Sequence, residues 1–350
     1  MATTFHALTV SDVERLCDDA VAVTFDVPDE LAELYTFRPG QSLTLRREVD
    51  GVEARRSYSI CAPAGSKPRI GVREVPGGAF SPWLVHEVRA GDRIEVLPPT
   101  GSFSPELDVP GHHVLIAAGS GITPILSIAS SLLGKASATL LYGNRRTDTV
   151  MFADELADLK DANREHLDLV HVLSREPREA ELFSGRLDAD KLRALLPALL
   201  DVAEVDHWWL CGPFGMVTDA QAVLAELGVP RSRVHQELFF VDDLPPEPVR
   251  HTEPGVEGPS SAVSVQLDGR TTDVVLPRDV TILEGAQRVR PDLPFACKGG
   301  VCGTCRAKVL CGDVDMRRNF ALEPAEVAAG FVLTCQSFPA SDRVEIDFDA

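Results

Sequence analysis

The sequence predicts a multidomain chain in which an antiparallel β-barrel comes first, an α/β domain with a doubly wound parallel sheet second, and a small α+β domain last. Three observations predict this order. Short alternating strands with many turn residues occupy 1–107, strand-like and helical stretches alternate over 108–241, and 242–260 is rich in Pro, Gly and acidic residues. We therefore expect domains at 1–107, 108–241 and 261–350, joined by a linker at 242–260.

The first of these regions has the pattern of short half-buried strands. Apolar and polar residues alternate over 20–27 and again over 41–45. Dipeptides that favour turns, such as Pro39-Gly40 and Asp50-Gly51, separate the strand-like stretches. Repeated short strands of this kind predict a small antiparallel barrel.

The second region alternates between two periodicities. The run 112–118 reads as a buried strand, and a helical pattern follows it over 124–133. Further strand-like stretches occur at 137–142, 167–173, 206–211 and 233–238, with helical stretches between them. Regular alternation of strands and helices at this spacing predicts a parallel, doubly wound sheet.

The third region begins with a hairpin pattern. Strand-like residues at 262–267 and 272–276 flank Asp268-Gly269, a dipeptide favoured in tight hairpin turns. A short helix is expected over 281–287, with Thr281 as its N-cap and Glu284 three residues on, as in a capping box.

Four cysteines carry the most specific signal in the chain. Four residues separate Cys297 from Cys302, two separate Cys302 from Cys305, and Cys335 follows at a distance. This is the ligand spacing of a plant-type [2Fe–2S] cluster. Glycines at 299, 300 and 303 allow backbone N–H groups to turn toward the negatively charged sulfurs.

Two other readings of these cysteines are weaker. Cys302 and Cys305 alone form a common zinc half-site, but no second Cys-x2-Cys motif or His pair accompanies them. A disulfide is less favoured still, because nothing marks the chain as secreted. Cys17, Cys61 and Cys311 fall outside the ligand spacing, and we assign them no role.

Composition excludes several classes of partner. The formal net charge is −19, and residues 106–260 carry most of it, which argues against binding to nucleic acid. No apolar run is long enough to span a membrane, so no membrane association is expected. The first residues lack a charged and then apolar signal segment, and we expect a cytoplasmic protein.

Three turns share one device for binding anions. In 77–82, 119–124 and 211–213, glycines or capping residues precede a proline that can open a helix. The start of a helix beside glycines presents free N–H groups and the positive end of a dipole to an anion. One such turn is usually only a helix cap, whereas three suggest sites for nucleotides.

The first turn lies near a strand that could hold a flavin. Arg56 could pair with a phosphate, Tyr58 could stack on or edge an aromatic ring, and Ser59 could form a hydrogen bond. An ordinary charged strand face explains these residues equally well by themselves. With Gly77 to Ser81 nearby, a flavin site is the better account.

The second and third turns end strands of the predicted parallel sheet, where such sheets bind nucleotides. Arg145 and Arg175 end the two following strands and are expected on the same rim. Paired arginines there could bind an adenosine 2′-phosphate and favour NADPH over NADH, although solvent-facing arginines are the ordinary alternative. Cys211 could contact a nicotinamide, or it could be an inert buried thiol.

Together, the motifs at 56–59, 77–81, 119–124 and 211–213 resemble the ferredoxin–NADP reductase family, and the C-terminal region resembles the β-grasp-like plant-type ferredoxins. A reductase followed by a ferredoxin resembles the reductase components of bacterial multicomponent oxygenases. Residues 297–308, 319–322 and 333–337 are most similar to the reductase subunits of phenylacetyl-CoA epoxidases.

This resemblance implies an NAD(P)H-dependent oxidoreductase that passes electrons from NADPH, with NADH as a possible substitute, through a flavin and the cluster to the oxygenase subunits of a di-iron oxygenase. The pyrophosphate turn favours FAD, although some relatives carry FMN. The alternatives are a reductase for a Rieske-type hydroxylase, such as a steroid-ring hydroxylase, and a non-catalytic electron carrier or redox sensor.

The resemblance also assigns roles to individual residues. It implies a catalytic group near the flavin, consisting of Ser59, Cys211, Glu237 and Phe239. It implies cofactor contacts by Arg56, Tyr58, Ser59, Gly77, Gly78, Ala79, Phe80, Ser81, Gly119, Gly121, Thr123, Pro124, Arg145, Ser174, Arg175, Cys211, Gly212, Pro213 and Phe239, and cluster ligation by Cys297, Cys302, Cys305 and Cys335.

Overall fold

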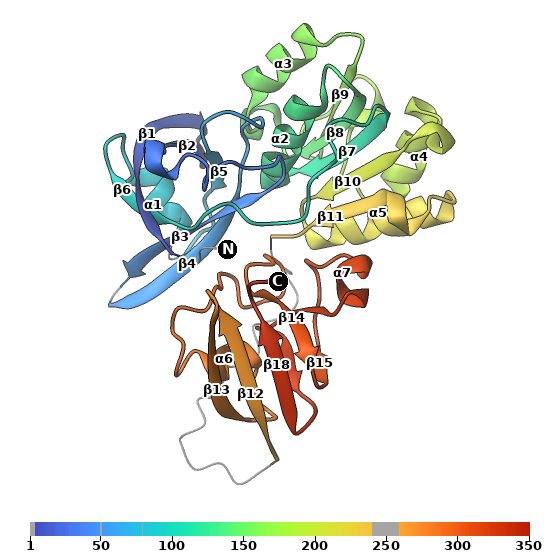
Figure 1. Ribbon diagram of the computed structural model, residues 1–350. Coiled ribbons are helices and arrows are strands. Elements are labelled where there is room, and N and C mark those ends of the chain that lie inside the picture. Colours follow the sequence, from blue (N-terminus) through green and yellow to red (C-terminus); the bar gives the residue numbers. More distant parts are fainter. Residues whose placement is uncertain (1–3, 50, 79, 240–258) are drawn as a thin grey trace. The chain divides into compact units, whose positions relative to one another are not determined.

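A computed structural model describes residues 4–49, 51–78, 80–239 and 259–350 (Figure 1). The chain divides into two compact units. One comprises His6–Ala54 and Tyr58–Val241, and the other comprises Asp242–Ala350 with Met1–Phe5 and Arg55–Ser57. The expected linker falls almost entirely outside the described residues, and the three domain boundaries remain predictions. In the described part of the chain, no helix is both long and apolar enough to cross a membrane.

The larger unit begins with the expected antiparallel barrel. Its sheet has the order β4-β3-β6-β1-β2-β5. The strands are β1 (His6–Cys17), β2 (Ala20–Asp26), β3 (Ser42–Val49), β4 (Val52–Ser59), β5 (Arg69–Arg73) and β6 (Arg93–Val96). A bridge between Ile60 and Ile70 links the end of β4 to β5, so the two outer strands of the order meet and the barrel closes. The short helix α1 (Ser81–His86) follows the turn after β5.

The same unit continues into a five-stranded parallel sheet of order β11-β10-β7-β8-β9, as the alternating pattern predicted. Its strands are β7 (His112–Ala118), β8 (Ser137–Asn144), β9 (Leu167–Leu173), β10 (His207–Cys211) and β11 (Val234–Glu237). Its helices are α2 (Ile122–Leu132), α3 (Ala153–Ala162), α4 (Ala189–Leu199) and α5 (Phe214–Glu226). The chain extends the sheet from β7 in one direction through β9 and then returns to add β10 and β11 on the other side. The carboxyl ends of β7 and β10 therefore form the switch point where such sheets bind ligands.

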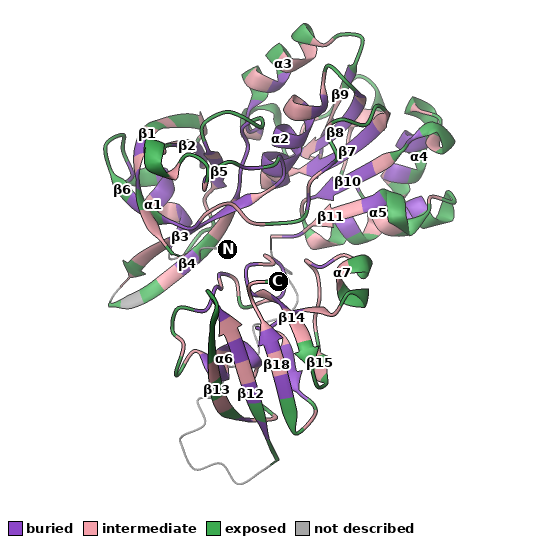
Figure 2. Cartoon of the chain, in the orientation of Figure 1, coloured by how far each residue is buried: buried purple, intermediate pink, exposed green. Residues whose placement is uncertain are grey.

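Burial follows this plan (Figure 2). The central strands β7 and β8 are almost wholly buried, whereas α3 has a single buried residue, Leu156. Apolar residues of α2, β7 and β8 pack with Met151 and Phe152 into one core. The barrel encloses a second core that includes Leu8, Phe25 and Leu45.

Three histidines and a tryptophan form a ladder across neighbouring strands of the parallel sheet. We call His113 on β7, His207 and Trp209 on β10 and His235 on β11 the histidine ladder. The indole of Trp209 stacks on His235 with ring centroids 4.2 Å apart and donates a hydrogen bond of 3.1 Å to Nδ1 of His113. Burial lowers the pKa of His113 and of His235 to about 4, and their mutual proximity to His207 adds to the effect.

The smaller unit contains a mixed sheet of order β13-β12-β18-β14-β16. Its elements are β12 (Ser260–Leu267), β13 (Arg270–Pro277), α6 (Ile282–Ala286), β14 (Arg306–Cys311), β15 (Val314–Met316), α7 (Pro324–Ala328), β16 (Phe331–Leu333), β17 (Ser337–Pro339) and β18 (Arg343–Asp347). The first hairpin pairs in parallel with the last long strand, β18, as in a β-grasp.

Two local predictions for this unit are confirmed. Asp268 and Gly269 form the turn between β12 and β13, both with positive φ, as a tight hairpin turn requires. The Thr281 hydroxyl accepts a hydrogen bond from the backbone N–H of Glu284 and so caps α6.

Candidate functional site

Two backbone turns meet at the switch point of the parallel sheet. A Cβ atom added to Gly121 would lie 2.1 Å from the carbonyl oxygen of Cys211, so only glycine permits this approach. A Cβ added to Gly212 would lie 3.3 Å from the side chain of Ala118. The sheet therefore brings the predicted turns at 119–124 and 211–213 side by side, although they are far apart in the sequence.

A carboxyl group from the last strand reaches the barrel at this point. Ser59 on β4 donates a hydrogen bond of 2.8 Å to Oε2 of Glu237 on β11. Burial raises the pKa of Glu237 to about 7, and the bond from Ser59 opposes this shift without cancelling it. Cys211 pairs with Glu237 in the sheet register, and burial raises the pKa of its thiol well above the ordinary value.

These three residues can handle a proton but offer no reactive thiolate. A carboxyl with a pKa near 7 exchanges its proton readily at neutral pH, and the Ser59 hydroxyl extends its reach. The Cys211 thiol is fully buried and stays protonated, so it packs here as a small apolar side chain. Phe239, two residues after Glu237, packs at the edge of the adjoining core.

The Ser81 side chain closes the turn before α1. The backbone N–H of Val75 donates a hydrogen bond of 2.9 Å to the Ser81 hydroxyl, which is buried, and Gly77 adopts a φ of 75°. The ring of Phe80 is buried, and its centroid lies 6.1 Å from that of Tyr58. The expected contact residue Ala79 lies outside the described residues.

Strand β4 carries Tyr58 and Ser59 as expected, and Arg56 is exposed on the same strand. A flavin dinucleotide needs an apolar and aromatic surface for its ring, polar groups that orient the ring, and N–H donors for its pyrophosphate, and the residues above supply groups of each kind. The residues present therefore fit the FAD that the motifs predicted.

Side-chain hydrogen bonds to its own carbonyl groups hold the turn between β7 and α2 in place. Tyr142 on β8 donates a hydrogen bond of 3.0 Å to the carbonyl oxygen of Gly119, which adopts a φ of 56°. The Thr123 hydroxyl donates to the carbonyl of Ser120, and both Thr123 and Pro124 are buried. The backbone of this turn is thus the part presented to a ligand, whereas the Thr123 side chain is already engaged.

Pro213 differs slightly from expectation. Pro82 and Pro124 lie within the first turns of their helices, but Pro213 is the residue before α5, which begins at Phe214. Pro213 is therefore the N-cap residue of α5, where its missing N–H leaves no backbone donor unpaired.

The rim formed by the ends of β8 and β9 brings the two predicted arginines together. The backbone N–H of Arg175 donates a hydrogen bond of 2.8 Å to the carbonyl of Arg145, and both residues are exposed. Ser174 bonds through its N–H to the carbonyl of Asn144. Sequence reasoning missed Glu176, whose carboxylate accepts two hydrogen bonds of 2.8 Å from Thr147 on the same rim.

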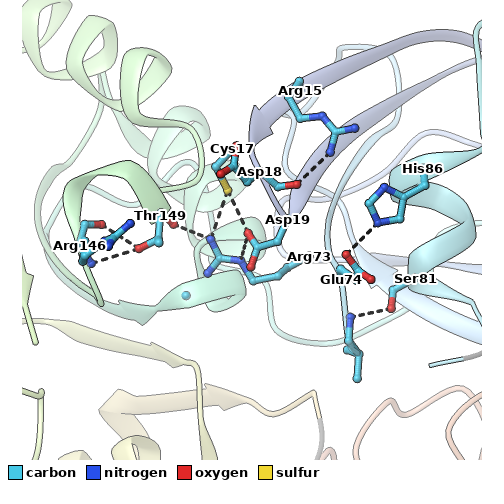
Figure 3. Close-up of polar contacts among 12 residues, drawn as sticks. Arg15, Cys17, Asp18, Asp19, Arg73, Glu74, Ser81, His86, Arg146 and Thr149 are labelled. Atoms are coloured by element: carbon cyan, nitrogen blue, oxygen red, sulfur yellow. Dashed lines mark hydrogen bonds and ion pairs between the residues drawn. The ribbon is translucent and has the colours of Figure 1, made fainter. Parts of the chain in front are cut away.

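Sequence reasoning also missed Arg73, at the end of β5 (Figure 3). Its guanidinium forms an ion pair of 3.2 Å with Asp19 in the turn between β1 and β2, contacts the Cys17 sulfur at 3.5 Å, and donates to the carbonyl of Thr149. A Cβ on Gly119 would lie 3.5 Å from its Nη1 atom. Arg73 therefore joins the barrel to the nucleotide-binding half of the unit.

In the smaller unit, the four predicted cysteines form two pairs. The Cys302 thiol and backbone N–H groups of Gly299, Val301 and Cys302 lower the pKa of Cys297 to about 6. The Cys305 thiol, assisted by Gln336 and the N–H of Gly300, lowers the pKa of Cys335. In each pair, therefore, one sulfur is favoured as a thiolate, the form that ligates metal, while its partner thiol, Cys302 or Cys305, has a raised pKa and keeps its proton.

The loop geometry that produces this arrangement depends on positive φ angles. Lys298, Gly300 and Gly303 have φ values of 52°, 80° and 67°. In the described part of the chain, no three His, Cys, Asp or Glu side chains gather as they would around one metal ion. An all-cysteine two-iron cluster takes two thiolates for each iron, so the paired thiols fit the predicted [2Fe–2S] cluster.

Comparisons with known proteins agree with this reading. Three family models match, described as an oxidoreductase FAD-binding domain over residues 7–104, an oxidoreductase NAD-binding domain over 115–222, and a 2Fe-2S iron-sulfur cluster binding domain over 265–340. The chain is 43% identical to one of the subunits of the 1,2-phenylacetyl-CoA epoxidase of Escherichia coli, over 99% of each chain. It is 34% identical to the ferredoxin reductase component of 3-ketosteroid-9-alpha-monooxygenase from Rhodococcus rhodochrous, over 97% of this chain and 96% of the relative.

Among solved structures, phthalate dioxygenase reductase shares the fold. It matches with a TM-score of 0.60 and 24% identity, over 98% of each chain. A ferredoxin NADP+ reductase from Neisseria gonorrhoeae matches 69% of this chain with a TM-score of 0.58 and 21% identity.

These findings define the class as flavin- and iron–sulfur-dependent NAD(P)H oxidoreductases. Within that class, the chain belongs to the family of oxygenase reductase components in which a FAD-binding barrel and a NAD-binding domain precede a [2Fe–2S] ferredoxin domain. The predicted fold, enzyme class and cofactors are confirmed. The roles of individual site residues remain proposals.

Proposed function

We propose that this protein is the NADPH-dependent reductase of a phenylacetyl-CoA epoxidase whose oxygenase subunits hold a di-iron centre. The observation that supports this most strongly is the 43% identity to a subunit of the Escherichia coli epoxidase over 99% of both chains. Because the alignment covers nearly all of both chains, the similarity includes the ferredoxin region that would face an acceptor.

When bound, the flavin accepts a hydride from NAD(P)H and releases electrons one at a time to the cluster. In this proposal the chain's residues position these groups and accept the proton that remains after the electrons have left. Tyr58 and Phe80, whose ring centroids are 6.1 Å apart, would border the flavin ring, and the turns at Gly119 and Cys211 would hold the nicotinamide end of the nucleotide. A hydride brings a hydrogen atom that must leave as a proton once its electrons have gone. Ser59 would pass that proton to Oε2 of Glu237, which lies 2.8 Å away.

The nucleotide preference is proposed from the rim at the ends of β8 and β9. Arg145 and Arg175 are adjacent through a backbone hydrogen bond and both are exposed, so their guanidinium groups can reach one phosphate. The Glu176 carboxylate accepts its hydrogen bonds from Thr147 and not from either arginine. We therefore expect NADPH to be preferred over NADH.

The acceptor is tested by reconstitution. Under anaerobic conditions, the purified protein and NADPH should reduce the oxygenase subunits of a phenylacetyl-CoA epoxidase, and addition of oxygen and phenylacetyl-CoA should then give the epoxide. The control replaces the reductase with its Cys335→Ala variant. Flavin reduction by NADPH without any transfer to these subunits would contradict the proposal.

A second acceptor is favoured by the other relatives. Four ketosteroid monooxygenase reductases are 34% or 35% identical over 97% or 98% of this chain. The oxygenase component of a 3-ketosteroid-9-alpha-monooxygenase should therefore be assayed in parallel. Faster reduction of that component than of the epoxidase subunits would reverse the order of the two candidates.

A further inference from the structure

Strand β5 of the barrel lies against the starts of two helices of the nucleotide-binding half. A Cβ atom added to Gly71 would lie 2.5 Å from the Thr123 methyl group and 2.9 Å from the ring of Phe152. Thr123 belongs to the first turn of α2, and Phe152 immediately precedes α3. Only a glycine at position 71 allows this strand to approach both helices so closely.

Arg69, two residues earlier on β5, forms an ion pair with the start of α3. One guanidinium nitrogen pairs at 2.8 Å with Glu155, in the first turn of α3, and another pairs at 2.6 Å with Glu14 on β1. The guanidinium carbon lies 5.2 Å from the centroid of the Phe152 ring. Only 16% of the Arg69 side chain is exposed, whereas its partners Glu14 and Glu155 are 54% and 37% exposed, so water screens the two ion pairs from the carboxylate side only.

Phe152 shows that this contact shapes the backbone as well. Its φ is 58°, a left-handed conformation that aromatic residues rarely adopt. Such a conformation persists when surrounding contacts determine it, and here these are the close approach of Gly71 and the position of Arg69 over the ring. The segment from Arg145 to Phe152 joins the nucleotide rim to α3, so a shift at α3 would be transmitted to that rim.

Barrel and nucleotide-binding halves of one chain ordinarily meet through polar contacts that permit relative motion. Hydride transfer needs the two reacting rings within a narrow range of distance and angle, and an error of about 1 Å can slow such a step about a hundredfold. A contact that fixes the angle between the halves therefore affects the rate of this step more than it affects nucleotide affinity.

We propose that Arg69 is a positioning residue for hydride transfer. Arg69 lies on the barrel, where it pairs with Glu14, and it holds the start of α3 against the barrel through Glu155 and Phe152. In this proposal it acts through these protein contacts and not on the nucleotide or the flavin itself. The proposal concerns the NAD(P)H-to-flavin step common to the family, and it does not depend on which oxygenase accepts the electrons.

Stopped-flow reduction of the FAD-loaded protein by NADPH tests this proposal. At saturating NADPH, Arg69→Gln and Glu155→Gln should each reduce the rate of flavin reduction at least fivefold, while the dissociation constant for NADPH changes less than twofold. Arg69→Lys, which keeps the charge but loses the two-sided geometry, should recover part of the rate. The long-wavelength absorbance of the flavin–nicotinamide pair should weaken in parallel.

The matched control is Arg193→Gln. Arg193 also pairs with two carboxylates, Glu226 and Asp190, but it joins α4 to α5 within the nucleotide-binding half. This variant should keep the wild-type rate of flavin reduction. The proposal is overturned if Arg69→Gln and Glu155→Gln reduce flavin at the wild-type rate, if they weaken NADPH binding alone, or if Arg193→Gln slows the step as much as they do.

Discussion

The two redox regions of this protein are built in opposite ways. At the switch point of the parallel sheet, the site is assembled from strand ends, and the contact between Ser59 and Glu237 joins residues 178 positions apart. In the ferredoxin region, three of the four proposed cluster ligands come from one loop, which is shaped by positive φ at Lys298, Gly300 and Gly303. A site made from strand ends is fixed by the sheet before any cofactor binds, whereas a loop of thiols gains much of its stability from the metal.

The largest effect should come from removing a cluster ligand. Cys335→Ala leaves one pair with a single thiol, so we expect loss of the cluster and at least a hundredfold slower electron transfer to a protein acceptor. Flavin reduction by NADPH should remain at the wild-type rate if the regions are built independently. Iron content per chain and stopped-flow flavin absorbance measure the two outcomes, and a slowed flavin step would show that the regions depend on one another.

The next effect concerns the buried carboxyl. Glu237→Gln should lower turnover with a one-electron acceptor about 10- to 100-fold, since a positioned proton acceptor contributes about this much or more. In the wild type, turnover should rise with pH through about 7, as Glu237 ionises and can accept the proton. The variant should lose this dependence, and an unchanged pH profile would argue against the role of Glu237.

The same pKa shift makes the folded state less stable as the pH rises, whereas turnover should become faster. Because folding raises the pKa of Glu237 above its ordinary value, the folded state prefers the protonated carboxyl. Its contribution to stability is fully present below about pH 4.5 and is lost as the pH rises through about 7. Thus the pH range that favours proton acceptance is the range in which this group stabilises the fold least.

A smaller effect is expected from the glycine at the switch point. Gly121→Ala places a Cβ atom 2.1 Å from the carbonyl oxygen of Cys211, so the backbone must shift at a cost of about 1–3 kcal/mol. Gly215→Ala, a control in α5 with no atom within 4 Å of the added Cβ, should stabilise its helix by about 0.5–1 kcal/mol. Chemical denaturation measures both, and equal stabilities would contradict the close approach.

The smallest effect should appear in nucleotide choice. Arg175→Ala should raise the KM for NADPH about tenfold and leave the KM for NADH nearly unchanged, because one charge-assisted hydrogen bond to a phosphate is lost. Arg178→Ala, farther along the same loop, is a suitable control. Equal effects on the two nucleotides would remove the basis for an NADPH preference.

The sequence predicted the local features of this molecule better than its long-range contacts. Cysteine spacing, strand and helix alternation, the Asp268-Gly269 turn and the Thr281 cap each depend on neighbours in the chain. The position of Arg175 beside Arg145 followed from the rule that parallel strands end at one edge. These features need no knowledge of how distant side chains pack.

The contacts that were missed depend on such packing. Neither Arg69 nor Arg73 lies in a motif, and their partners are recognisable only once the barrel meets the parallel sheet. The left-handed conformation of Phe152 has no sequence signal, since the residue itself disfavours it. Gly71 did carry a signal, because a lone glycine inside a strand pattern often marks a close backbone approach.

The histidine ladder has a practical consequence for handling the protein. Because folding lowers the pKa of His113 and His235 to about 4, the unfolded chain takes up these protons first as the medium is acidified. The free energy of unfolding should therefore fall as the pH is lowered from about 6.5 to about 4. Mildly acidic buffers are then poorly suited to purification or crystallisation, and the emission of the stacked indole would register the damage.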